Sequence, residues 1–142
     1  MKTYKSKISY GFLLVIFFLY VIITYFSVAD NSSFKSLLII SIIHISTFLF
    51  LLYMFFNTDY TIDYKTLKIR CGFMFKKDID IDKIKSISKT KSLLSSPAAS
   101  LTDRIELKFG TYDAVIISPK EKKEFIRALV KINPNIKNNL DN

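Results

Sequence analysis

Two long stretches without any charged residue are the feature that most restricts how this chain can fold. They cover residues 8–28 (ISYGFLLVIFFLYVIITYFSV) and 36–56 (SLLIISIIHISTFLFLLYMFF). Each helical residue adds about 1.5 Å of rise, so roughly 20 apolar residues cross the hydrocarbon core of a bilayer. The two stretches therefore predict a hairpin of two transmembrane helices, joined by the short segment 29–35.

A cleaved signal peptide and a buried helix pair of a soluble protein are the alternatives for these stretches. Lysines precede the first stretch, as in a signal peptide, but its apolar run is too long and no small-residue cleavage pattern follows before Asp30. The rest of the 142-residue chain is also too short to bury two such helices. Membrane insertion in contact with the lipid bilayer is the favoured interpretation.

The placement of basic residues predicts the orientation of the hairpin. Basic residues precede the first helix (Lys2, Lys5, Lys7) and follow the second (Lys65, Lys68, Arg70, Lys76, Lys77), whereas the connecting segment 29–35 carries one acid and one base. By the positive-inside rule, both termini are cytoplasmic and the connecting segment faces outside. We therefore expect a multi-pass protein of the inner cell membrane that crosses it twice.

His44, the single histidine, falls near the middle of the second apolar stretch. Counted from the connecting segment, Tyr20 lies at about the same depth as His44, and Thr24 lies near Ser41. Polar groups in lipid favour one another by around 0.6 to 2 kcal/mol, so Tyr20 and His44 are predicted to form an intramembrane polar pair or a contact of a homo-oligomer. A proton-responsive or metal site is the alternative, but neither helix offers an acidic partner.

From Thr58 onward the apolar pattern changes to the two-residue period of β-strands. Tyr60, Ile62 and Tyr64 are predicted on one face of a first strand. Turns are predicted at 65–66 and 76–78, and a Ser-rich loop at 89–103. About six short strands, the last two at 104–109 and 114–117, predict a β-sandwich or barrel.

A single amphipathic helix is predicted after the last strand. Ser118 is a candidate N-cap, Pro119 suits the first helical position, and Glu121 would complete a capping box. The apolar residues of the helix recur at helical spacing, and Pro134 ends it. The polar residues 135–142 are predicted to form a frayed tail. The fold class is therefore α+β, with the helix covering one face or opening of the strands.

Several short sequence patterns carry a family resemblance. They are Tyr60-x-Ile62 with Leu67-x-Ile69, Ile81-x-x-Ile84-x-x-Ile87, Ser96-Pro97-Ala98-Ala99-Ser100-x-x-Asp103-Arg104-Ile105, and Ile117-Ser118-Pro119-Lys120 followed by Phe125-Ile126. Together they resemble the short bacterial PH-like family of the YyaB-like kind. The resemblance covers roughly Tyr60 to Pro134 and implies a cytoplasmic PH-like domain, placed at 58–134. The apolar stretches predict the hairpin domain at 1–57, with helices at about 8–28 and 36–56, and the polar composition predicts the tail at 135–142.

Catalytic and metal chemistry finds little support in the sequence. The single His lies in a predicted membrane helix and Cys71, the single Cys, in a predicted strand, so neither a Cys–His pair nor a zinc site can form. Asp78, Asp80 and Asp82 alternate with isoleucines, which favours the solvated face of a strand over a cation site. We expect no enzyme activity, no cofactor and no metal.

The formal net charge of +9 raises the question of an anionic partner. Nucleic acid is disfavoured because the charges alternate in sign and lack an aromatic stacking pattern. The anionic inner leaflet is favoured, since each nearby Lys or Arg contributes about 1 kcal/mol of attraction to it. The candidate membrane-surface residues are Lys120, Lys122, Lys123 and Arg127.

The leading functional hypothesis is a non-enzymatic module at the inner membrane face that binds a protein or peptide partner. The candidate surface is the 92–104 loop with the adjacent strand edge, because exposed edges can accept a peptide strand. Its candidate residues are Ser96, Pro97, Ser100, Asp103 and Arg104, although a salt bridge or a loop-fixing hydrogen bond is the simpler role for the last two. The alternative hypothesis is immunity against a membrane-active bacteriocin, a function that the resembled family includes.

Overall fold

A computed structural model describes residues 1–29, 33–92, 100 and 103–140. The chain divides into two compact units. We call Ser9–Tyr53 the hairpin unit, and Met1–Ile8 together with Met54–Asn142 the β domain. The residues before the first helix, expected to belong to the hairpin, belong to the same compact unit as the strands.

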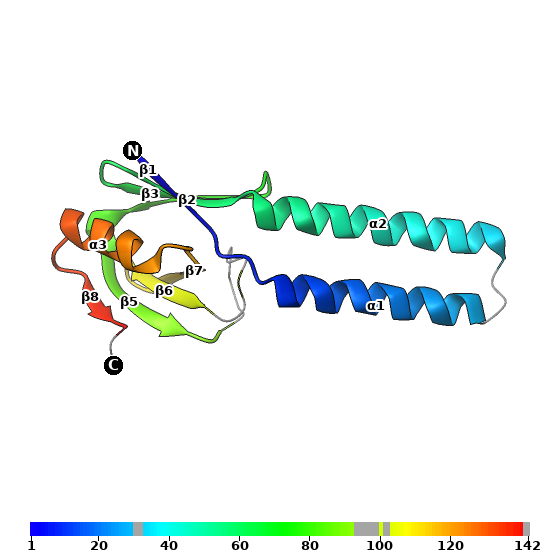
Figure 1. Ribbon diagram of the computed structural model, residues 1–142. Helices are drawn as coiled ribbons and strands as arrows, with labels where there is room; N and C mark the ends of the chain where they lie inside the picture. The colour runs from blue at the N-terminus through cyan, green and yellow to red at the C-terminus, as the bar shows by residue number, and fades with distance from the viewer. Residues whose placement is uncertain (30–32, 93–99, 101–102, 141–142) are drawn as a thin grey trace. The chain divides into compact units, whose positions relative to one another are not determined.

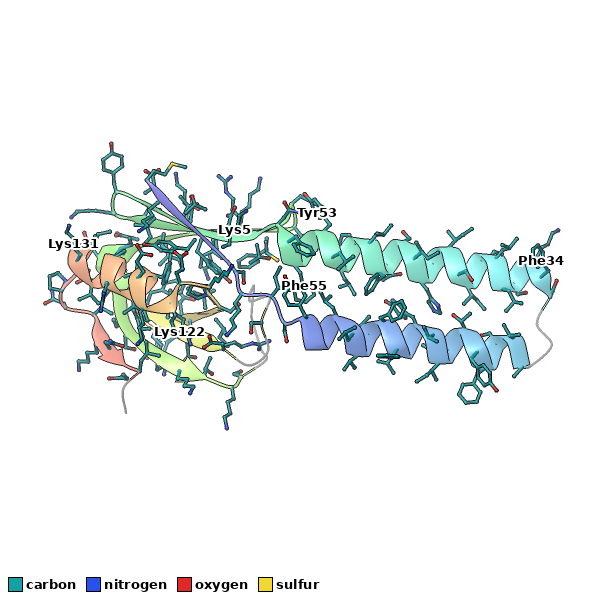
Figure 2. The ribbon with its side chains drawn as sticks, viewed as in Figure 1. Lys5, Phe34, Tyr53, Phe55, Lys122 and Lys131 are labelled. Atoms are coloured by element: carbon teal, nitrogen blue, oxygen red, sulfur yellow. The ribbon has the colours of Figure 1, made fainter. Side chains whose placement is uncertain are left out.

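Two long apolar helices form the hairpin unit: α1 (Tyr10–Ala29) and α2 (Phe34–Phe56). They lie side by side and run in opposite directions (Figure 1). Both are long and apolar enough to cross a membrane. Of the residues in these two helices, Leu13 alone is buried, and apolar side chains project from both helices along their length (Figure 2). The predicted pair of apolar helices is confirmed, and it suggests membrane anchoring.

Two four-stranded sheets form the β domain. The first has the order β1 (Lys2–Lys5), β2 (Thr58–Asp63), β3 (Thr66–Cys71) and β4 (Phe75–Asp80). A short 3₁₀ helix, η1 (Ile81–Lys83), leads to the second sheet, with the order β7 (Asp113–Ile117), β6 (Arg104–Phe109), β5 (Ile84–Thr90) and β8 (Lys137–Asn139). All neighbours are antiparallel except β5 and β8, which are parallel.

One apolar core joins the two sheets to the helix α3 (Lys122–Ile132) (Figure 1). The apolar face of α3 buries Phe125, Ile126 and Leu129. Alternate residues of the strands supply the other side of the core, among them Tyr60, Leu67, Ile69, Ile87, Ile105, Leu107 and Ile117. The α+β fold with a C-terminal helix against two sheets agrees with the sequence-based prediction, because the two-residue and 3.6-residue periods decide which face is buried.

The first and last strands were not predicted from sequence. Strand β1 pairs with β2, with Lys2 opposite Ile62 and Lys5 opposite Asp59. The ring of Tyr4 is 2% exposed and meets Phe125 edge-on at 5.2 Å between centroids. At the other end, β8 lies within the segment predicted to fray. Both strands are short and depend on pairing with distant residues, so neither has a local signal.

Two turns lie earlier than the sequence pattern indicated. The turn between β2 and β3 contains Tyr64, which has φ 50° and is 89% exposed instead of lying on the inner face. The next turn comes at Gly72, where φ is 54°, so 76–78 lie inside β4 and not in a turn. Glycine adopts this left-handed conformation without a Cβ clash, and that local freedom outweighs the turn signal of the charged residues.

The predicted capping box at the start of the last helix is wrong. Helix α3 begins at Lys122, after Glu121, and no side chain caps it with a hydrogen bond. Ser118 is instead fully buried. Its side chain is occupied by hydrogen bonds within the β domain, which compete with capping.

Candidate functional site

The predicted partner-binding loop is described in part. Ser96 and Pro97 lie outside the described residues. Ser100 is buried, and its backbone N–H donates to Ser118 Oγ at 3.2 Å. Arg104 is 4% exposed, and its guanidinium donates to the carbonyl oxygens of Ser100 and Ser92. These two residues therefore have contacts that fix the ends of the loop, and neither presents its side chain to solvent.

Asp103 links the loop to two distant parts of the β domain. Its carboxylate accepts hydrogen bonds from Lys7 Nζ at 3.1 Å and from Lys122 Nζ. Partial burial alone would raise the pKa of this carboxyl, but the two lysines lower the pKa of Asp103 below its ordinary value. Asp103 thus ties the segment after β1 to the first turn of α3.

A buried hydroxyl cluster, Ser6, Tyr60 and Ser118, lies beside this ion-pair group. Ser6 Oγ is 3.0 Å from Tyr60 Oη and 2.9 Å from Ser118 Oγ. Tyr60 Oη also accepts the backbone N–H of Ser118 at 3.1 Å. Burial raises the pKa of Tyr60 above its ordinary value, so the phenol stays protonated.

Sequence reasoning missed this cluster. Ser118 had a local explanation as a cap, and Ser6 lies more than 50 positions from Tyr60 along the chain. Backbone contacts extend the link: Lys7 N–H donates to Ser118 O at 2.7 Å, and Lys120 N–H donates to Lys5 O at 2.9 Å. The segment before the first helix is thereby bonded both to β2 and to the chain that follows β7.

A basic groove lies between α3 and β8. It has a volume of about 460 Å³ and is lined by Lys89, Asp103, Lys122, Lys123, Ile126, Arg127, Asn138 and Leu140. Three of the four predicted membrane-surface residues line it: Lys122, Lys123 and Arg127. Lys122 (Figure 2) is half-buried and bonded to Asp103, whereas Lys123 and Arg127 are exposed. Lys120, the fourth, is exposed outside the groove.

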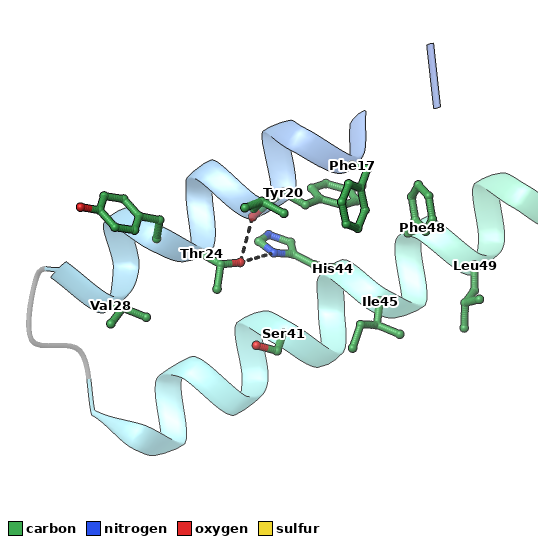
Figure 3. A pocket seen from close by; sticks show the side chains of 11 residues that line it. Phe17, Tyr20, Thr24, Val28, Ser41, His44, Ile45, Phe48 and Leu49 are labelled. Atoms are coloured by element: carbon green, nitrogen blue, oxygen red, sulfur yellow. Dashed lines mark hydrogen bonds between the residues drawn. The ribbon is translucent and has the colours of Figure 1, made fainter. Parts of the chain in front are cut away.

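Several polar residues of the hairpin unit, among them Tyr20, Thr24 and His44, line a cleft between the two helices (Figure 3). The rings of Tyr20 and His44 are stacked at 4.7 Å between centroids, with 5° between their planes. Thr24 Oγ1 is 3.2 Å from His44 Nδ1 and donates to the carbonyl oxygen of Tyr20 at 2.9 Å. The tautomer of His44 decides which of the two groups donates in the first contact.

The contacts of His44 thus differ in kind from the expected ones. The pair with Tyr20 is a ring stack, and the hydrogen bond of the imidazole goes to Thr24. Ser41 and Tyr25 line the same cleft, whose volume is about 500 Å³ and whose remaining lining residues are apolar.

The structure offers no metal centre among the residues that it describes, since no three His, Cys, Asp or Glu side chains gather there. Asp80 accepts the N–H of Asp82 at the start of η1, and Asp82 pairs with Lys65 at 2.8 Å. These two carboxylates are therefore engaged in a helix cap and an ion pair, which accounts for them without a cation.

Comparison with known protein families matches residues 58–133 to the bacterial PH domain. Searches of curated proteins and of solved structures gave no significant match. The matched segment begins at the first residue of β2 and ends just after α3, so it contains the six predicted strands and the helix. The chain therefore belongs to the bacterial PH domain family, with two apolar helices ahead of the family domain.

Proposed function

We propose that this protein is a membrane-anchored, non-enzymatic binding module whose PH-like domain lies at the cytoplasmic face of the inner membrane and binds a protein or peptide partner. PH domains are generally non-catalytic modules that bind proteins or lipids, which supports a binding role. The two apolar helices supply the anchor.

The observation that carries the proposal is the pairing of β1 with β2. Strand β1 precedes the first helix and β2 follows the second, yet they are neighbours in one sheet. Two segments paired in one sheet lie on the same side of a membrane, which requires an even number of crossings between them. Two crossings satisfy this condition, and the lysines of both segments favour the cytoplasmic side.

Cysteine labelling in intact cells tests the orientation. In a Cys71→Ser background, Phe34→Cys places a thiol at the start of α2, 75% exposed, and Tyr112→Cys places one in the turn between β6 and β7, 98% exposed. An impermeant maleimide should label Phe34→Cys from outside and Tyr112→Cys only after the membrane is permeabilised. Labelling of Tyr112→Cys in intact cells would contradict the proposed orientation.

The basic groove between α3 and β8 is the partner surface that we favour. Its exposed cations Lys123 and Arg127 lie beside the apolar side chains of Ile126 and Leu140, a combination suited to an acidic peptide with an apolar residue. The inward contacts of Ser100 and Arg104 shift the proposal away from these two loop residues. The predicted contact of Lys120, Lys122, Lys123 and Arg127 with anionic lipid is the competing proposal for the same cations.

Photo-crosslinking from position 123 distinguishes the two uses of the groove. A photoreactive residue replacing Lys123 in the full chain should give a protein adduct in cells, and the adduct should disappear when Arg127→Glu is added. A photoreactive residue at Tyr64, which is exposed in a different turn, is the matched control. Adducts to lipid alone would reject the partner proposal and favour membrane contact.

Immunity against a bacteriocin and membership of the narrower YyaB-like group remain predictions from the resemblance. Expression in a strain sensitive to membrane-active peptides should raise its tolerance if the protein confers immunity. Unchanged killing across several peptide classes would remove this alternative.

A further inference from the structure

The turn between β3 and β4 exposes two adjacent large apolar side chains. Phe73 is 65% exposed and Met74 is 66% exposed. The positive φ of Gly72 sets the conformation that starts the turn. Exposed apolar side chains that are contiguous often mark a contact with another molecule or with a membrane.

The structure fixes this turn beside the end of α2, within the β domain. Gly72 N–H donates to the carbonyl oxygen of Asn57 at 2.8 Å, and Asn57 follows Phe56, the last residue of α2. Thr58 pairs with Cys71 in the sheet, and Thr58 Oγ1 donates to the carbonyl oxygen of Met54 at 2.8 Å.

This attachment sets the level of the turn relative to a membrane. The apolar helix α2 ends at Phe56, and an apolar helix that spans a bilayer ends near the interface between hydrocarbon and headgroups. The β3–β4 turn is hydrogen-bonded to Asn57, the residue after Phe56, and so lies at that same level. Phe73 and Met74 therefore lie within reach of the interface.

A row of charged residues crosses the first sheet next to the turn. Lys5 is opposite Asp59, Asp59 is opposite Arg70, and Arg70 is opposite Lys76. Residues directly opposite one another point to the same face of a sheet, so this row brings three cations and one carboxylate together. Lys5 Nζ forms an ion pair with Asp59 Oδ2 at 3.9 Å.

The row carries an excess of positive charge close to the predicted interface. Arg70 and Lys76 are both exposed, and like charges directly opposite each other in a sheet are unfavourable. Anionic headgroups would relieve this repulsion and attract both side chains.

We propose that the β3–β4 turn is a second membrane contact of the β domain. Phe73 and Met74 enter the interfacial layer of the bilayer, and Arg70 and Lys76 contact anionic headgroups. The inference rests on the membrane anchoring in the proposed function and adds a lipid-binding surface distinct from the α3 cations. An apolar tip with flanking cations is the combination that holds peripheral segments at an anionic bilayer.

A single introduced tryptophan tests the proposal, because the natural chain has none. Met74→Trp places the reporter at the turn. Tyr64→Trp is the matched control at the opposite end of β3, a six-residue strand of roughly 20 Å. Phe18→Trp, within α1, reports insertion of the hairpin itself. Each full-length variant is reconstituted in vesicles of phosphatidylcholine and phosphatidylglycerol with brominated acyl chains, and quenching is measured.

The expected result is strong quenching of Phe18→Trp, clear quenching of Met74→Trp with a blue-shifted emission, and little quenching of Tyr64→Trp. Adding Arg70→Gln and Lys76→Gln to Met74→Trp should lower its quenching about twofold in vesicles rich in phosphatidylglycerol, and high salt should act likewise. Vesicles of phosphatidylcholine alone should show a weaker effect of these two substitutions.

Two outcomes overturn the inference separately from the proposed function. If Phe18→Trp is quenched but Met74→Trp behaves like Tyr64→Trp, the hairpin is inserted and the turn does not touch lipid. If the emission of Met74→Trp shifts with the protein-to-lipid ratio and not with brominated lipid, a second copy of the chain covers the turn. Absence of quenching in Phe18→Trp would instead reject membrane anchoring.

Discussion

The hairpin unit and the β domain use similar apolar side chains in opposite ways. Phe18 in α1 is 60% exposed, whereas Phe125 in α3 is fully buried between the sheets. Polar groups also differ: Thr24 and His44 pair between two helices, while Tyr60 lies in a buried cluster of hydroxyl groups. This difference suggests that the two units suit different surroundings, because exposed apolar surface is favourable in lipid and costly in water.

The largest expected contrast comes from removing one aromatic ring in each region. Phe125→Ala should lower the free energy of unfolding of the β domain by about 3–5 kcal/mol, because it leaves a cavity in the core. Phe18→Ala, the matched variant on an exposed helix surface, should leave that free energy unchanged. Urea unfolding of the full chain in detergent micelles measures both. Equal losses of unfolding free energy in the two variants would contradict the difference in burial between Phe125 and Phe18.

A smaller effect is expected from the buried hydroxyl of Tyr60. Tyr60→Phe keeps the ring but leaves Ser6 and the N–H of Ser118 without that partner, which should cost about 1–3 kcal/mol. The same urea titration measures the loss. Tyr112→Phe, which changes a hydroxyl on a 98% exposed ring, is the control. A neutral result for Tyr60→Phe would mean that the cluster does not stabilise the β domain.

The contact between Thr24 and His44 in the hairpin should contribute less free energy than the hydroxyl of Tyr60. Thr24→Val keeps the shape of the side chain but removes the bond with His44 Nδ1, at a cost of about 0.6–2 kcal/mol to helix association. Detergent-driven dissociation of the helices, followed by a pair of fluorophores on α1 and α2, measures the change. A double-mutant cycle with His44→Phe should show that the two losses are not additive. Additive losses would show that the two groups act independently.

The smallest effect concerns the pH dependence of the β domain. The pKa of Asp103 is lowered in the folded state by Lys122 and Lys7, so its contribution to stability is present above the unfolded pKa and is lost as the pH falls through the folded pKa. Asp103→Asn should therefore lower the melting temperature slightly at neutral pH. The difference from the natural protein should begin to shrink near the ordinary carboxyl pKa, about 4, and vanish only below the lowered pKa of Asp103 in the folded protein.

Melting curves of both proteins across this acid range test the prediction. Because Asp63 and Glu124 are also ion-paired with lowered pKa values, the quantity to compare is the difference between the two proteins, not the acid lability of either. A difference that does not change with pH would assign the effect of Asp103→Asn to something other than its charge.

Much of the β domain could be predicted because the spacing of apolar residues in its strands and helix is a property of neighbouring residues. The alternation that includes Tyr60 and Ile62 indicated an inward face, and the spacing of Phe125, Ile126 and Leu129 indicated the buried face of α3. The turn at Tyr64 and the one at Gly72 were placed wrongly, because turn position depends on strand pairing as well as on composition. The exposure of the two apolar residues after Gly72 follows from that register.

The candidate sites could be predicted less well. The stretch 100–104 stands out in sequence, yet Ser100 and Arg104 are buried and bonded within the β domain. Composition drew attention to these residues but gave no sign of the direction in which their side chains point. That direction depends on contacts with distant groups, such as Ser118 and the carbonyl oxygen of Ser92.

The two apolar helices, the six central strands and the last helix could be predicted from the sequence. The length of an apolar stretch, its lack of charge and the spacing of its apolar residues are properties of neighbouring residues. The hydrophobic effect favours burial of these apolar residues away from water, so the pattern predicts the element and its buried face. Long-range contacts instead make Lys2–Lys5 a strand of the β domain, bring Ser118 into a buried cluster and place the β3–β4 turn beside the end of α2. Each of these depends on hydrogen bonds between residues far apart in the chain, for which a local pattern carries no signal.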